Sequence, residues 1–219
     1  WKLFSVIGGD TADFLQRISS QNYKNPIIGE TRDMAILTAT GDIIGYCIGW
    51  HPKPNEFGFA IHESEYERTL AALEQFHFSE DLAIARHEDL VPVILFSGDP
   101  DDVVSGNGGS TSFVRRGICA GDVWMIVRTA GVQNRVPLRM GGNEFIGATD
   151  DLFNFFRIRS GWPLPRLDYD EESMILSVGL SRGVAFDKGC YPGQEVVERA
   201  TAIGASPKKL VTIRCDSAP

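Results

Sequence analysis

The chain has 219 residues, of which 43% are hydrophobic and 10% aromatic, and its formal net charge is −8. That length suits one large or two compact domains, and the composition is that of a globular protein rather than a disordered or fibrous chain. No stretch approaches the roughly 18 consecutive apolar residues that a membrane helix needs. The chain has 29 acidic and 21 basic residues, which argues against a protein whose whole surface binds nucleic acid. This balance does not exclude a local basic patch.

Cysteine and histidine spacing narrows the class of protein further. The four cysteines, Cys47, Cys119, Cys190 and Cys215, lie far apart and form no C-x-x-C pair, which fits a reducing compartment better than a disulfide framework. The N-terminus also lacks a basic region followed by an apolar one, so we expect a cytoplasmic protein. The histidines show no pair at metal-ligand spacing, and the sequence therefore predicts no metal site.

The first half of the chain predicts two helices among short strands. Phe14, Leu15 and Ile18 fall on one face of a first helix. A second helix is predicted over 63–78, where apolar residues recur at helical spacing and acidic residues stand near the start. A turn at 40–42 is expected to join the first two strands as a hairpin. The expected strands cover 34–37, 43–50, 57–61, 82–86, 91–96, 113–116 and 123–128.

The second half predicts one loop, one further helix and a final strand. The Gly- and Ser-rich stretch 105–110 is typical of a flexible loop. Thr149 as a cap and Gly161 as a stop signal bound a helix with an apolar set of side chains. The run 210–214 is strand-like, and the acidic run 168–172 is expected to be solvated. Helices dispersed among short hairpin-like strands predict an α+β fold with antiparallel sheet rather than a doubly wound fold.

One segment differs from the rest because a lone cysteine lies in a Gly- and Pro-rich turn between polar residues. It covers 186–199 and reads FDKGCYPGQEVVER. Such a turn leaves backbone open to a ligand. Lys188 and Arg199 would favour the thiolate of Cys190, whereas a structural cysteine is expected in an apolar run, as at Cys47. From its chemistry alone, Cys190 can equally be a functional thiol or an exposed cysteine without a role.

The same segment carries a resemblance to a known family. Residues 188–199 resemble the K-G-C-Y-[IT]-G-Q-E-x-[VI]-x-R signature of the YgfZ folate-binding family, relatives of the glycine-cleavage T-protein or aminomethyltransferase. Residues 7–16, IGGDTADFLQ, are similar to that family's G-x-D-A-x-x-F-L-Q opening, and 40–44, TGDII, to its G-x-I hairpin. Residues 157–163, RIRSGWP, resemble the R-I-E-A-G-x-P element before the signature, so the resemblance covers most of the chain.

The resemblance implies a fold and a division into lobes. We expect two related antiparallel α+β lobes with flanking helices and tetrahydrofolate in a central cavity. The folate-binding lobe would combine residues 1–50 with 147–207, and the second lobe would cover 51–146. Residues 208–219 would begin the family's C-terminal β-barrel lobe, the rest of which we expect to be absent from this chain.

The resemblance also implies a function. A member would bind tetrahydrofolate or a folate derivative as an accessory protein rather than an enzyme, and would support the assembly or repair of iron–sulfur clusters. Through those client proteins it would support cluster-dependent tRNA modification. The signature cysteine, which matters to that role, is Cys190 here. The candidate folate contacts are Tyr191 and Trp162 for the rings, Gln194 and Glu195 for a hydrogen-bonding edge, and Lys188, Arg199 or Arg166 for the glutamate tail. Alternatively, the two aromatic residues belong to the core, and the glutamate and Arg199 form a surface ion pair.

Three departures from the family pattern shape the alternatives. Aminomethyltransferases carry an acidic pair after the hairpin, where this chain has Gly45 and Tyr46, so the base for one-carbon transfer is missing there and aminomethyl transfer ranks second. Arg159 replaces a glutamate that contacts the pterin, and an arginine cannot accept the N–H donors of that ring. Pro192 stands where the signature has Ile or Thr, and this change is compatible with a rigid turn because proline presets its own φ. A third hypothesis, a direct tRNA-binding module, is disfavoured by the negative net charge.

Overall fold

The structure of the protein is a computed structural model in which a defined part of the chain is described. The described residues are 1–96, 113–116, 123–129, 139–140, 143–144, 149–202 and 208–213. The predicted loop at 105–110, together with Cys119 and Cys215, lies outside them.

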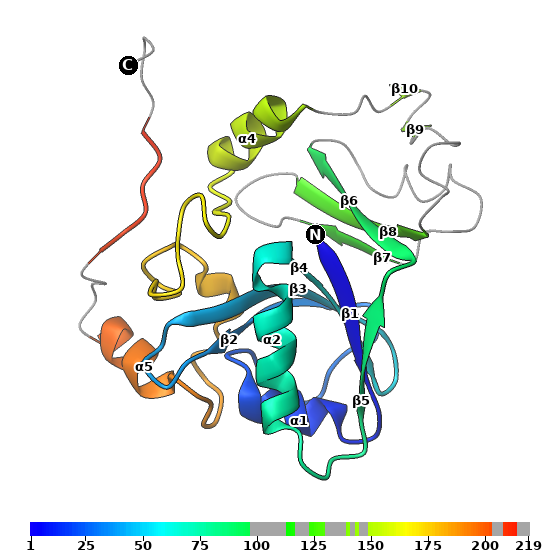
Figure 1. The fold of residues 1–219 in the computed structure, drawn as a ribbon, viewed down its shortest axis with the longest axis vertical. Helices are drawn as coiled ribbons and strands as arrows, with labels where there is room; N and C mark the ends of the chain where they lie inside the picture. The colour runs from blue at the N-terminus through cyan, green and yellow to red at the C-terminus, as the bar shows by residue number, and fades with distance from the viewer. Residues whose placement is uncertain are drawn as a thin grey trace.

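A five-stranded antiparallel sheet dominates the fold, in the order β2-β3-β4-β1-β5 (Figure 1). Its strands are β1 (Lys2–Ile7), β2 (Thr31–Leu37), β3 (Ile43–Lys53), β4 (Glu56–Ile61) and β5 (Ala83–His87). The turn at 40–42 joins β2 to β3, which confirms the predicted hairpin. Strand β1 was not predicted: its four central residues are all buried, so they show no alternation of polar and apolar positions.

A second, three-stranded antiparallel sheet has the order β6-β8-β7. Its strands are β6 (Leu90–Phe96), β7 (Phe113–Arg116) and β8 (Val123–Thr129), and a two-stranded pair is formed by β9 (Arg139–Met140) and β10 (Asn143–Glu144). Because β6 begins soon after β5, the chain passes almost directly from one sheet to the next (Figure 1). Strands β4 and β5 share the large sheet with β1–β3, across the lobe boundary predicted at residue 50. The division into a folate-binding lobe and a second lobe stays a prediction.

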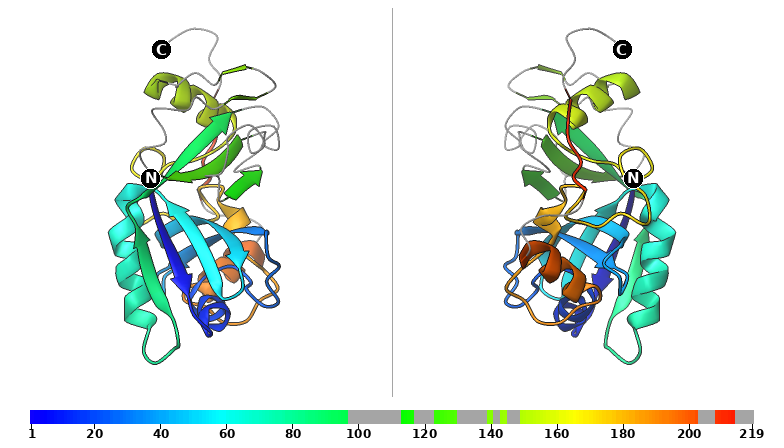
Figure 2. Two further views of the ribbon diagram at one scale, coloured as in Figure 1. Left: turned by 90° about the vertical axis from the view of Figure 1, so that its right-hand side faces the viewer. Right: turned by 90° about the vertical axis from the view of Figure 1, so that its left-hand side faces the viewer.

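Four α-helices complete the described part of the structure. They are α1 (Thr11–Ile18), α2 (Glu63–Phe76), α4 (Asp150–Arg159) and α5 (Gln194–Ala202). Helix α2 runs along one side of the large sheet (Figure 2) and agrees with the helix predicted over 63–78. Together with the antiparallel sheets, these helices confirm the predicted α+β fold. None of the described helices is long and apolar enough to cross a membrane.

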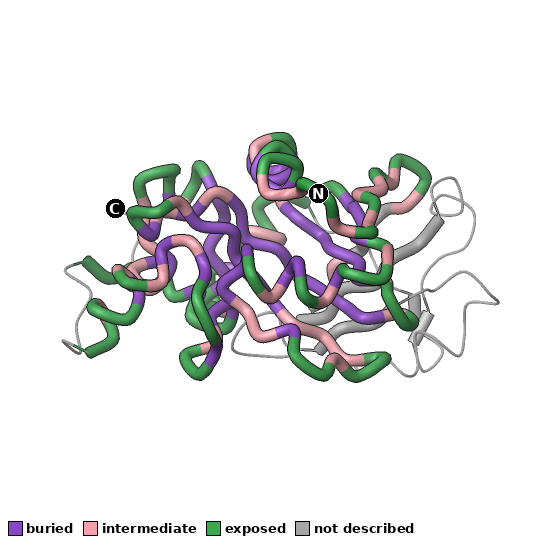
Figure 3. The backbone as a smooth tube through the Cα atoms, turned by 90° about the horizontal axis from the view of Figure 1, so that it is seen from below, coloured by how far each residue is buried: buried purple, intermediate pink, exposed green. Residues whose placement is uncertain are grey.

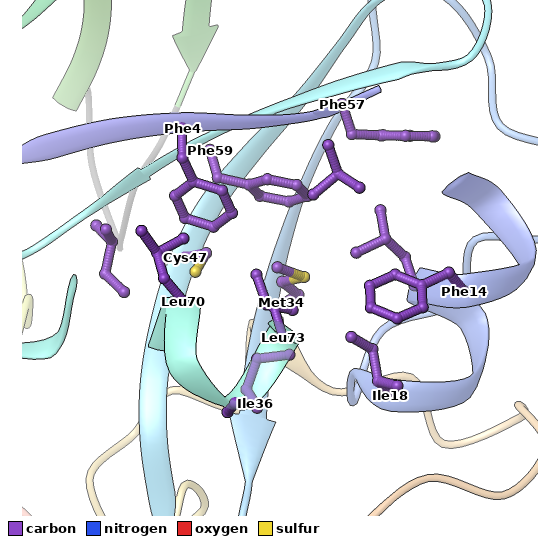
Figure 4. Close-up of a cluster of buried hydrophobic side chains, with 14 of the residues drawn as sticks. Phe4, Phe14, Ile18, Met34, Ile36, Cys47, Phe57, Phe59, Leu70 and Leu73 are labelled. Carbon is purple, nitrogen blue, oxygen red and sulfur yellow. The ribbon is translucent and has the colours of Figure 1, made fainter. Parts of the chain in front are cut away.

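Both faces of the large sheet bury apolar side chains, and its strands are largely buried along the tube of Figure 3. Met34 and Ile36 of β2 point into a cluster with α1 and α2 (Figure 4). The alternate residues Ala35 and Leu37 belong to a second cluster, formed with side chains from residues 169–197. Burial of each large side chain contributes roughly 1.5–3 kcal/mol. The segment that carries the signature is therefore part of the folded core and not an appendage.

In the second half, helix α4 agrees with the sequence analysis and the last predicted strand does not. Helix α4 begins after Thr149 as predicted, with the Thr149 hydroxyl accepting from the backbone N–H of Leu152. Its apolar set is not buried, because Leu152, Phe155, Phe156 and Ile158 keep between 36% and 56% of their surface exposed. The strand predicted at 210–214 does not form over its described residues, 210–213, which have no regular secondary structure.

Candidate functional site

The signature segment forms a tight turn that leads into α5. Gly193 has a φ of +81°, a region that L side chains avoid, and the backbone N–H of Val197 donates to its carbonyl as the helix begins. A Cβ at Gly193 would lie 2.6 Å from the carbonyl oxygen of Thr38 and 3.0 Å from the Cα of Gly41. The signature turn therefore packs directly on the β2–β3 turn, and two motifs that are distant in sequence meet at one place.

The β2–β3 turn is itself fixed by side-chain hydrogen bonds. The hydroxyls of Thr38 and Thr40 donate to Asp42 Oδ2 at 3.2 and 2.5 Å, and the backbone N–H of Asp42 donates to Thr38 Oγ1 at 3.0 Å. The next residue, Ile43, donates its N–H to the carbonyl of Ser173 at 3.1 Å. The surface on which the signature turn rests is thus a rigid one.

Lys188 anchors the other end of the signature segment. Its side chain is buried, and Nζ donates to the carbonyls of Gln16 and Gln21, both at 2.8 Å, and to that of Ser19. Two of these acceptors stand at the C-terminal end of α1, where the helix dipole favours a cation. Burial lowers the pKa of Lys188 to about 8. All three N–H groups are engaged, so a contact with the glutamate tail of a folate would require one of these bonds to be exchanged.

The two predicted aromatic ligands are buried at different places. Tyr191 is 8% exposed in the cluster formed with residues 169–197, with Lys188 Nζ 4.9 Å from its ring centre, and burial raises the pKa of its phenol to about 12. Trp162 is 3% exposed in another cluster, where its ring lies 5.4 Å from Trp1 and 6.1 Å from Phe153. The structure does not bring Tyr191 and Trp162 into one ring-binding slot, and only Trp162 lines a described cavity.

The other polar residues of the signature and Cys190 lie at the surface, whereas Val197 is buried. Cys190 is a free, exposed cysteine next to Tyr191, whereas Cys47 is free and fully buried, as expected of a structural cysteine. Arg199 and Glu195 form an ion pair of 2.7 Å along α5, with side chains 68% and 83% exposed. Gln194 donates to Glu198 at 2.6 Å on the same helix. These polar side chains pair locally on the surface beside an accessible thiol.

A cavity of about 220 Å³ lies between the end of α4, the following turn and the C-terminal segment. Most of its walls are apolar, and its polar side chains include one cation and one carboxylate. Residues 157–163 contribute to one wall, which is the element that resembles R-I-E-A-G-x-P, and residues 210–213 lie across another. The backbone N–H of Leu210 donates to the carbonyl of Ser177 at 2.7 Å, which ties that last segment down. The lining residues are Arg157, Ile158, Gly161, Trp162, Pro163, Asp168, Val178, Gly179, Leu210, Val211, Thr212 and Ile213.

Arg157 and Asp168 form the polar corner of this cavity. Arg157 Nη1 lies 2.5 Å from Asp168 Oδ2, and the two side chains are 6% and 23% exposed. Arg157 Nε donates to Asn154 at 2.6 Å, and the backbone N–H of Leu164 donates to the same Asp168 oxygen at 2.8 Å. The sequence interpretation missed this pair, because Asp168 begins an acidic run that was expected to be solvated. The spacing of the two residues gives no signal on its own. Arg159, in contrast, is exposed.

Two further buried carboxylates stand by the hairpin that lacks the acidic pair. Tyr46 donates its hydroxyl to Asp33 Oδ2 at 2.8 Å, and its backbone N–H donates to Glu65 Oε2 at 3.0 Å. Glu65 also accepts from Arg68 and from the Tyr169 hydroxyl, and burial raises the pKa of its carboxyl. Both carboxylates are at most 2% exposed, so they bind protein groups rather than solvent. Among the described residues no group of three or more His, Cys, Asp or Glu side chains is placed to hold a metal ion.

Comparison with known proteins defines the class of fold. No family model and no curated protein sequence matches the chain. Among solved structures, the chain is similar to the glycine cleavage system aminomethyltransferase T from Bartonella henselae, with a TM-score of 0.75 at 18% identity. The match covers 94% of this chain and 62% of that chain, so this chain spans less than two thirds of that protein. The chain thus has the α+β fold of the aminomethyltransferase T protein.

Proposed function

We propose that this chain binds tetrahydrofolate and acts as a YgfZ-like accessory protein that supports the assembly or repair of iron–sulfur clusters. The observation that carries the proposal is the fold, which it shares with a glycine cleavage aminomethyltransferase over nearly its whole length. The signature and hairpin motifs support it further, because these distant segments pack against each other. The clients would be cytoplasmic iron–sulfur proteins, including those that modify tRNA.

The cavity beside Trp162 suits the ring system of a folate. Its volume of about 220 Å³ is below the roughly 300–1,000 Å³ of pockets that hold whole drug-sized ligands, so it would take the pterin and leave the aminobenzoyl-glutamate outside. Its walls are largely apolar and its two charged side chains stand together, which is the arrangement that orients a flat heterocycle. Bound tetrahydrofolate would supply a carrier for one-carbon groups.

Cys190 would be the functional thiol of the proposed role. It is exposed on a turn that is held at one end by Lys188 and at the other by the contact of Gly193 with the β2–β3 turn. A thiol must be accessible to react or to bind a soft metal centre of a client. The exposed ion pair of Glu195 and Arg199 on α5 would border the same surface.

The second candidate is folate-dependent aminomethyl transfer, which is favoured by the name of the structurally similar protein, an aminomethyltransferase. It requires a carboxylate that can reach the one-carbon carrier. The hairpin offers Gly45 and Tyr46 instead, and the nearby carboxylates of Asp33 and Glu65 are buried and already accept hydrogen bonds. We therefore rank an accessory role first.

Calorimetric titration of the purified chain with tetrahydrofolate and with 5-formyl-tetrahydrofolate tests the proposal. We expect micromolar binding of at least one form, and no binding of p-aminobenzoyl-glutamate, which lacks the pterin. Absence of binding by both folates would overturn the folate role. A glycine-cleavage assay separates the two candidates, because turnover with a folate acceptor would favour the aminomethyltransferase.

A further inference from the structure

The polar corner of the cavity points to how a ligand would be recognised. We infer that Arg157 and Asp168 together read the amino-oxo edge of a pterin ring, with Asp168 accepting from the ring N–H donors and Arg157 donating to the ring carbonyl. The inference rests on the proposed folate function and adds to it the orientation of the ring. It also assigns ligand contacts to two residues that the signature does not contain.

Asp168 has one carboxylate oxygen available for a ligand. Oδ2 accepts from Arg157 Nη1 and from the backbone N–H of Leu164. Oδ1 accepts no hydrogen bond from any described residue. A carboxylate oxygen can accept two hydrogen bonds, so Oδ1 suits an edge that presents two adjacent donors.

Arg157 also has a nitrogen available to donate to a ligand. Nε is engaged by Asn154, and Nη1 by Asp168 and the Trp162 carbonyl. Nη2 has no hydrogen-bond acceptor among the described residues, and a guanidinium carries five N–H groups in a fixed plane. The cavity corner therefore presents a donor next to an acceptor.

The donor–acceptor order matches one chemical class. The edge of a 2-amino-4-oxo pteridine presents, in sequence, a carbonyl acceptor, a ring N–H and an amino group. Because Arg157 and Asp168 already neutralise each other, their corner favours a neutral polar edge over a cationic amine. The surrounding Ile158, Trp162 and Val178 provide apolar surface for the faces of the ring.

Asp168 also supplies the acceptor that the resemblance expects at position 159. The resemblance expects a glutamate there as the acceptor for the ring, and this chain has an exposed arginine. The carboxylate of Asp168 lines the cavity instead, and it is held by the buried Arg157, which stands two residues before Arg159. The acceptor is thus present in the structure although it is absent from its usual position in the sequence.

A matched pair of ligands tests the inference directly. 6,7-Dimethylpterin and 6,7-dimethyllumazine have the same shape, but the lumazine replaces the amino donor with an oxygen. We expect the wild-type chain to bind the pterin at least about tenfold more tightly, since a site built for a donor leaves its carboxylate unpaired against an acceptor. We expect Asp168→Asn to reduce this ratio to near one, because an amide can serve either edge, while Asp13→Asn at an exposed position should leave the ratio unchanged.

A second variant tests the cavity independently, in case Asp168→Asn does not fold. Val211 lines the cavity and is 64% exposed, so Val211→Trp should narrow the cavity without disturbing the core and weaken tetrahydrofolate binding at least about fivefold. Tetrahydrofolate binding without discrimination between the two heterocycles, or with discrimination retained in Asp168→Asn, would overturn the inference and leave the proposed function standing. Unchanged affinity in Val211→Trp would also overturn it. Failure of the wild-type chain to bind any folate would remove both.

Discussion

Gly41 and Gly193 lie back to back, so that a Cβ added to Gly193 would come within 3.0 Å of the Cα of Gly41. Both glycines have positive φ, +84° and +81°. This contact joins the β2–β3 turn to the turn that presents Cys190. A Cβ at Gly41 would lie 3.1 Å from the Cβ of Val196 in α5, and one at Gly193 would push the two turns apart.

Gly193→Ala should therefore destabilise the protein by about 2–4 kcal/mol, because the backbone strain of a positive φ adds to the clash with the Thr38 carbonyl. Urea denaturation measures the change. Gly189→Ala is the matched control in the same turn, since its φ is not positive and its Cβ would meet nothing within 4 Å. A loss of stability as large at Gly189 as at Gly193 would contradict the explanation.

Local patterns predicted the parts of the fold whose periodicity was clear. Helix α2 shows helical spacing of buried Tyr66, Leu70 and Leu73, and the β2–β3 hairpin has a Gly-containing turn between two apolar runs. Strand β1 was missed because it lies between two other strands and is buried on both faces. Helix α5 was missed because its first residues belong to a segment read as a turn.

Long-range contacts limited what the sequence could say of the site. The motif residues were found, but nothing in the sequence shows that the Lys188 ammonium bonds to carbonyls near the end of α1, because backbone acceptors leave no residue-type signal. The separation of Tyr191 from Trp162 depends on which core each ring enters. The pairing of Asp168 with Arg157 likewise needs the turn after α4 to close.

The stability of the protein should depend on pH through Lys188. Burial lowers its pKa from 10.5 to about 8, so between these two values the unfolded chain binds more protons than the folded one, and stability rises with pH. Relative to Lys188→Met, the wild type should gain up to about 3 kcal/mol between pH 8 and 10.5 and show a constant difference below pH 8. Urea denaturation at several pH values measures this, with Lys24→Met, an exposed lysine, as the control. A difference that falls with pH would mean that the three carbonyl bonds hold the charged form more strongly than burial opposes it.

Chemical labelling should distinguish Cys190 from Cys47. Cys190 is exposed, whereas Cys47 is fully buried and its burial raises the pKa of the thiol. With N-ethylmaleimide we expect Cys190 to react at least about 100-fold faster, because only an accessible thiolate attacks the reagent. Peptide mass spectrometry reports each site separately. Comparable rates before denaturation would show that the core around Cys47 opens readily.

Cys190→Ser should keep the fold and lose the function. The residue is exposed, so the substitution should change the free energy of unfolding by less than about 0.5 kcal/mol. The proposed role nevertheless requires the thiol, and the variant should not complement a bacterial strain that lacks its YgfZ-type protein. Growth and the activity of iron–sulfur enzymes in that strain are the measurements, with equal protein levels as the control. Full complementation by the serine variant would exclude a thiol role.

Two ion pairs in the chain should differ sharply in their contribution to stability. Arg157 is nearly buried, so Asp168→Ala would leave its charge without a partner and should cost about 3 kcal/mol, at the lower end of the range for buried pairs because Asp168 is 23% exposed. Glu195 pairs with Arg199 on the surface of α5, where Glu195→Ala should cost at most about 0.5 kcal/mol. Urea denaturation of both variants at low and high salt measures the contrast, since screening acts on the exposed pair only. Equal costs for the two substitutions would mean that solvent reaches Arg157, and the cavity corner would then be too wet to orient a ligand.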